Sequence, residues 1–132
     1  MKLPIYQIDA FANAVFAGNP AAVCPLERWP SDATMQSIAA ENNLAETAFF
    51  VPRAANVVPG ANGPDYDLRW FTPEAEVDLC GHATLASGYV VFTALAPGRD
   101  SVTFHSRSGP FSSRAASVSP SINSMTRKSM PS

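Results

Sequence analysis

The sequence contains few cysteines and no long hydrophobic run, and each shortage excludes a class of protein. Cys24 and Cys80 are the only cysteines in 132 residues and do not form a CxxC pair. Neither a disulfide framework nor a structural metal site is therefore expected, and both thiols should be reduced. No segment approaches the roughly 20 apolar residues that cross a bilayer, and the amino terminus lacks the apolar run of a signal peptide. We expect a cytoplasmic protein without a membrane partner.

Charged residues are also scarce, at 15% of the chain, and they are unevenly distributed. All eleven acids lie in residues 1–100, whereas residues 101–132 contain bases and no acid. The few basic residues form no stripe that could neutralise a phosphate backbone, so nucleic acid is not an expected partner. Hydrophobic residues make up 46% of the chain, which is enough for the core of one domain.

Hydrophobic periodicity predicts an α+β fold. Alternating and apolar runs predict five strands, over residues 5–11, 21–26, 46–51, 66–71 and 102–105. Ser31 should cap a helix that continues to about Asn42, with Asn43 as its stop signal. A second helix, over residues 82–95, is apolar on most sides, which is typical of a helix buried within other structure. We expect strands to wrap around it.

The composition changes near residue 106. Residues 106–132 contain ten serines, no acid and little apolar periodicity. Such a composition rarely buries enough apolar surface to fold, so we predict disorder there. The chain is accordingly divided into a folded part, 1–105, and a serine-rich tail, 106–132.

The start of the second predicted helix is a candidate anion site. Gly81-His82-Ala83-Thr84 would present unpaired backbone N–H groups at the positive end of the helix dipole, where a substrate carboxylate can bind. His82 could add a hydrogen bond. The alternative is that Asp78 or Thr84 caps a purely structural helix and that His82 is a surface or core histidine whose hydrogen bonds are satisfied.

Glu46 is a candidate general acid/base, because it begins a predicted strand with apolar neighbours and burial favours the protonated carboxyl group. The alternative is an exposed charge at a strand end. Cys80 precedes a helix start that would stabilise a thiolate, although a buried inert thiol is the commoner outcome. Asn19 lies in a Gly18-Asn19-Pro20 turn that either faces a ligand or is a plain hairpin corner.

Five blocks resemble the amino-terminal half of the PhzF-like isomerases of phenazine biosynthesis. They are Asp9-Ala10-Phe11, Gly18-Asn19-Pro20-Ala21-Ala22-Val23, Leu44-Ala45-Glu46-Thr47-Ala48-Phe49, Leu68-Arg69-Trp70-Phe71-Thr72-Pro73 and Leu79-Cys80-Gly81-His82-Ala83-Thr84. The resemblance implies a diaminopimelate epimerase-like fold of two similar lobes, each a mostly antiparallel sheet around a central helix, with the active site between them. This chain would be one such lobe.

The resemblance also implies a function. The prototype isomerase moves a proton within trans-2,3-dihydro-3-hydroxyanthranilate, without metal or organic cofactor, using a glutamate that matches Glu46. Gly81, His82 and Ala83 would then bind the substrate carboxylate, with Asn19 nearby. Relatives in this family are often homodimers, so a second copy is a candidate partner.

The sequence departs from the family pattern after residue 105. Full-length relatives are about twice as long, and nothing here matches the Asp-Pro-x-Thr-Gly-Ser-like motif of their second lobe. We therefore predict a truncated, poorly active isomerase with an unrelated tail. Two alternatives remain: a thiol-dependent racemase or epimerase that uses Cys80, and a non-catalytic lobe.

Overall fold

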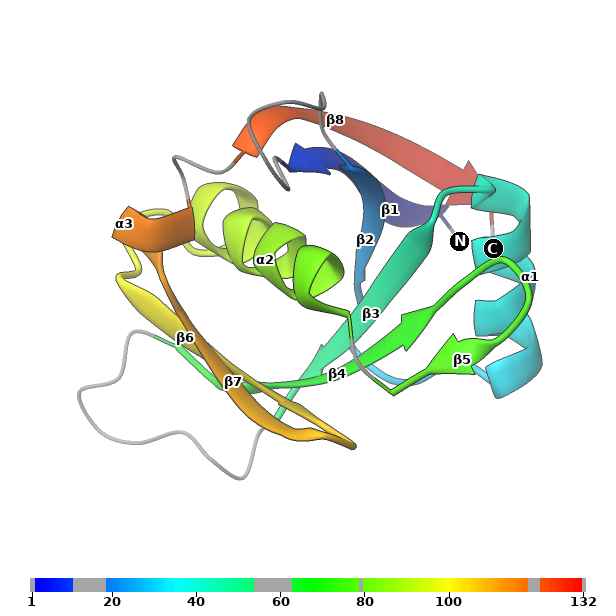
Figure 1. Ribbon diagram of the computed structural model, residues 1–132, viewed down its shortest axis with the longest axis horizontal. Helices are drawn as coiled ribbons and strands as arrows, with labels where there is room; N and C mark the ends of the chain where they lie inside the picture. The colour runs from blue at the N-terminus through cyan, green and yellow to red at the C-terminus, as the bar shows by residue number, and fades with distance from the viewer. Residues whose placement is uncertain (1, 11–18, 54–62, 79, 119–121, 132) are drawn as a thin grey trace.

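An apolar helix, α2 (Gly81–Val90), lies on the inner face of a strongly curved sheet (Figure 1). This computed structural model describes residues 2–10, 19–53, 63–78, 80–118 and 122–131. The strands are β1 (Lys2–Ala10), β2 (Asn19–Pro25), β3 (Glu46–Pro52), β4 (Tyr66–Phe71), β5 (Glu76–Val77), β6 (Ser101–Ser106), β7 (Gly109–Arg114) and β8 (Ile122–Pro131). The helices are α1 (Asp32–Asn42), α2 and the short α3 (Ala115–Val118).

The sheet is mixed but mostly antiparallel. Its strand order is β7-β6-β4-β3-β2-β1-β8, with β5 paired to β4 beside this path. Only the β2–β3 and β4–β6 pairs are parallel among the described strands. The predicted α+β class and the sheet around a central helix are therefore confirmed.

Small and β-branched side chains allow the sheet to close tightly around α2. Ala83, Ala86 and Val90 are fully buried, and they belong to one apolar cluster with Trp70 and Phe104 of the sheet. The predicted helix over 82–95 is confirmed, with one change in geometry. The α-helix ends at Val90, and residues 91–95 continue it as a π-helical turn.

Helix α1 packs on the outer face of the sheet (Figure 1). The Ser31 hydroxyl accepts a hydrogen bond from the Thr34 amide at 3.1 Å, and Asn43 ends the helix in the left-handed conformation, with φ of 52°. Met35 and Ala39 face a second core cluster that includes Phe49 and Phe71. The predicted caps at both ends of this helix are confirmed.

The structure contradicts the predicted disorder of residues 106–132 over the part that it describes. Residues 109–114 form β7, which pairs with β6 as a hairpin, and residues 122–131 form β8, which pairs with the edge of β1. Val118 is buried in the cluster around α2, and Phe111 packs against that cluster. A few well-placed apolar side chains and backbone pairing therefore order a segment whose average composition is polar.

The hairpin also crosses the predicted domain boundary at residue 105.

No helix in the part of the chain that the structure describes is both long and apolar enough to span a membrane.

Candidate functional site

Glu46 is the first residue of β3. In the parallel pairing of β2 and β3 it lies opposite Ala21. Its side chain is partly buried, and the Oε2 oxygen is fully buried without a hydrogen-bond partner among the described residues. A carboxylate oxygen in this state can accept a proton or a hydrogen bond from a bound molecule.

The start of α2 is not capped by a side chain. Cys80 occupies the N-cap position in an extended conformation and makes no side-chain capping bond. Among the described residues, neither Asp78 nor Thr84 accepts a hydrogen bond from the first-turn amides. The Asp78 carboxylate accepts a hydrogen bond from the Arg107 guanidinium instead, and the Thr84 hydroxyl donates to the Cys80 carbonyl at 2.8 Å. The structure therefore contradicts the alternative that these side chains cap a purely structural helix.

The Cys80 thiol lies where Glu46 and the helix start meet. Burial raises the pKa of Cys80, and the negative charge of the Glu46 carboxylate raises it further. The Glu46 charge therefore acts on the N-cap residue of α2, which Gly81, His82 and Ala83 follow in the first turn.

Of the other predicted residues, Gly81 and His82 lie in the first turn of α2, and Asn19 lies at the start of β2. Gly81 is the exposed first residue of α2, and a Cβ atom there would meet nothing within 4 Å, so the helix start is open to a ligand. The His82 Nε2 atom is buried and has no hydrogen-bond partner among the described residues. Asn19 is the first residue of β2, next to the β3 start, and its side chain is outside the described part of the structure.

Trp70 ties this site to the sheet, a contact that the sequence analysis missed. Its indole N–H donates to the Thr84 hydroxyl at 3.1 Å, and both side chains are buried. Thr84 lies one turn into α2, so the bond fixes the helix start relative to β4. No local pattern indicates this pairing, because the two residues come from different elements.

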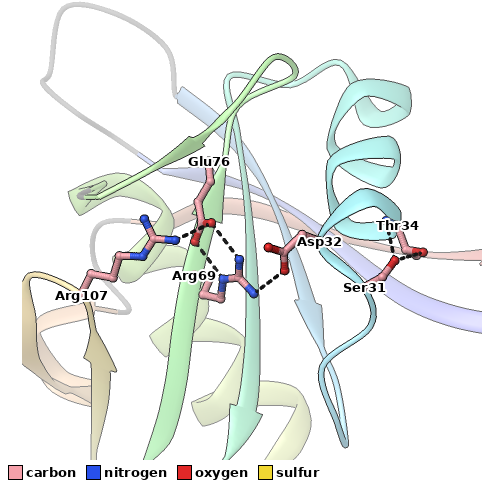
Figure 2. A network of polar contacts seen from close by, with 6 residues as sticks. All are labelled: Ser31, Asp32, Thr34, Arg69, Glu76 and Arg107. Carbon is pink, nitrogen blue, oxygen red and sulfur yellow. Dashed lines mark hydrogen bonds and ion pairs between the residues drawn. The ribbon is translucent and has the colours of Figure 1, made fainter.

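A separate polar network lies on the outer face of the sheet (Figure 2). Arg69 donates to both oxygens of Glu76 at 2.8 Å and to Asp32 at 3.1 Å, and Arg107 donates to the same Glu76 at 2.8 Å. The hydrogen bonds from Arg69 are the main reason that the pKa of Glu76 is lowered. Alternating strand residues place Arg69 on the outer face, but its partners could not be predicted locally.

The network borders a surface pocket of about 490 Å³, which none of the predicted site residues lines. Trp29, Arg53, Asp67 and His105 contribute to its walls. Its charged groups are already paired with one another, as in the contact of 3.6 Å between Arg53 and Asp67. This pocket is therefore distinct from the site at Glu46.

Comparison with solved structures defines the class of fold. A PhzF-family phenazine biosynthesis protein from Enterococcus faecalis superposes with a TM-score of 0.73 at 50% identity, over 86% of this chain and 40% of that one. A predicted epimerase from Pseudomonas aeruginosa superposes with a TM-score of 0.66 at 28% identity, over 83% of this chain and 37% of that one. The chain has the fold of one lobe of the PhzF and epimerase class.

The chain belongs to the phenazine biosynthesis-like protein family, PhzC-PhzF, whose model matches residues 8–132. That match includes the segment that we predicted to be unrelated to the family. An uncharacterized isomerase from Pseudomonas aeruginosa is 54% identical over 114 residues, which cover 86% of this chain and 40% of that protein. The chain spans about 40% of the length of this relative.

Proposed function

We propose that this chain is the catalytic-glutamate lobe of a cofactor-independent isomerase that moves a proton within a small carboxylate substrate. The observation that supports the proposal is the pair of buried atoms without a hydrogen-bond partner among the described residues, Glu46 Oε2 and His82 Nε2, the second of them at the uncapped start of α2. Isomerase names among the relatives support the same reaction class.

The two halves of the site have different roles. The first-turn amides of Gly81, His82 and Ala83 bind the substrate carboxylate, because a helix start offers N–H groups and a positive dipole end. Glu46 then removes a proton from one carbon and returns it to another. Asn19, the first residue of the strand paired with β3, is proposed to contact the same substrate.

The isolated chain should turn over its substrate slowly. It spans about 40% of the relative's length, and a cleft enzyme needs its second wall to orient substrate and exclude water. Misplacement alone can reduce a rate by about 100-fold. The prototype substrate class is trans-2,3-dihydro-3-hydroxyanthranilate and related small cyclic carboxylates.

The test joins residues 1–114, which keep the β6–β7 hairpin intact, to the remaining part of the Pseudomonas aeruginosa relative and follows conversion of trans-2,3-dihydro-3-hydroxyanthranilate in deuterated water. Glu46→Gln should reduce turnover by about 100-fold or more, because the proton carrier is lost. Glu41→Gln, an exposed change on α1, is the matched control and should leave the rate unaltered. An unaltered rate in the Glu46→Gln protein would contradict the proposal.

The thiol-dependent alternative is less well supported by the site. Burial and the Glu46 carboxylate both raise the pKa of Cys80, which disfavours the thiolate that such chemistry needs. In the joined protein, Cys80→Ser should therefore retain isomerase activity. Loss of all activity in that variant would support the racemase mechanism instead.

A further inference from the structure

The polar network on the outer face continues to the chain that enters α2. Asp78 lies two residues before Cys80, and it is held from the β6–β7 turn by two residues (Figure 2 shows Arg107). Ser108 donates from its hydroxyl to the Asp78 carbonyl at 2.6 Å, and Arg107 donates to the Asp78 carboxylate at 3.3 Å. We name Arg107 and Ser108 the turn clamp.

The turn clamp is itself anchored in the sheet. Arg107 shares the Glu76 Oε1 atom with Arg69, and Glu76 is only 16% exposed. The turn has two residues between Ser106 and Gly109, and Gly109 has a φ of 114° that favours glycine. A short turn with this geometry holds both clamp residues at a fixed distance from β5.

We propose that the turn clamp positions the start of α2 against Glu46, so that Arg107 and Ser108 act as positioning residues for the site. The path is short: the clamp holds Asp78, and three residues later the chain begins the first turn of α2, which carries the buried and unpartnered Nε2 atom of His82. Catalytic constellations tolerate displacements of only about 0.5 Å, so a loose entry to α2 would misalign the site.

The two cysteines offer a test that needs no substrate. Cys80 reports opening at the start of α2, whereas Cys24 is fully buried in the cluster beneath α1 and reports global unfolding. The inference rests on the proposed function, because the clamp bears on catalysis only if Glu46 and the start of α2 form the active site. Because thiol modification involves no turnover, failure of the clamp and failure of the isomerase assignment are distinguishable.

The experiment measures iodoacetamide modification of each cysteine by mass spectrometry in the native full chain. The Arg107→Gln/Ser108→Ala variant should modify Cys80 about tenfold faster with no change at Cys24, because the contacts that hold Asp78 are lost. The control, Arg114→Gln/Ser117→Ala, makes the same chemical changes at exposed positions after the hairpin turn and should leave both rates unaltered.

A conservative change provides the second readout. The single variant Arg107→Lys keeps Ser108 and a cation near Glu76. Its Cys80 modification rate should therefore lie much closer to that of the unaltered chain than to that of the double variant. The proposal is overturned if Cys80 and Cys24 accelerate together, which indicates general destabilisation, or if the Cys80 rate does not change in the double variant.

Discussion

Glu76 has two arginine partners on the outer face of the sheet, and its side chain is largely shielded from solvent. Arg69 binds both of its oxygens and Arg107 binds one of them, each at 2.8 Å. A bidentate contact between arginine and a carboxylate, such as that of Arg69 with Glu76, is stronger than a contact through a single hydrogen bond, particularly when it is partly buried. At the scale of single residues, Glu76 therefore joins β4 and the β6–β7 turn through one carboxylate, and Arg69 extends the network to Asp32 of α1.

Glu76→Gln should lower the free energy of unfolding by about 1–2 kcal/mol at neutral pH. Hydrogen bonds from Arg69 hold the pKa of Glu76 below its usual value of 4.5, so this stabilisation is present above that pH and is lost as the pH falls through the lowered pKa. Urea unfolding of both proteins at successive pH values tests this, with the exposed Glu74→Gln as control. If the difference in free energy of unfolding between the unaltered chain and Glu76→Gln stays constant at acid pH, the Glu76 carboxylate is not its source.

At the scale of secondary structure, α1 could be predicted because its signals are local. Ser31 and Asn43 mark the two ends by their own chemistry, and the structure has both caps. Strands β7 and β8 could not be predicted in this way. Strand β8 is ordered by pairing with β1 and by Ile122 against the core, which are contacts between parts of the chain far apart in sequence. Strand β7 pairs with its neighbour β6, but its sequence, GPFSSR, has no alternating apolar pattern that would indicate a strand.

The N-cap of α1 gives the prediction at this scale. Ser31→Ala removes the acceptor for the Thr34 amide and should reduce the free energy of unfolding by about 1 kcal/mol. Ser37→Ala, at an exposed position within the same helix, is the matched control and should have little effect or slightly stabilise the protein. Chemical denaturation of the two variants compares them directly. If Ser31→Ala and Ser37→Ala reduce the free energy of unfolding equally, the capping hydrogen bond contributes nothing to stability.

At the scale of the whole molecule, the sheet brings together residues that lie more than thirty positions apart in the sequence. The sequence pattern predicted the helix start at 81–83 and a strand beginning at Glu46, and the parallel register of β2 and β3 places Asn19 and Glu46 at one end of the sheet. The Trp70–Thr84 bond and the turn clamp depend on the complete fold, so no local pattern could indicate them.

The proposed reaction requires the Glu46 carboxylate to face the start of α2. The most direct measurement is the pKa of Cys80, obtained from the pH dependence of its alkylation in the unaltered chain and in the Glu46→Gln and Glu41→Gln variants. Because the Glu46 carboxylate raises the pKa of Cys80, Glu46→Gln should lower it and Glu41→Gln should not. An identical thiol pKa in all three proteins would contradict the claim.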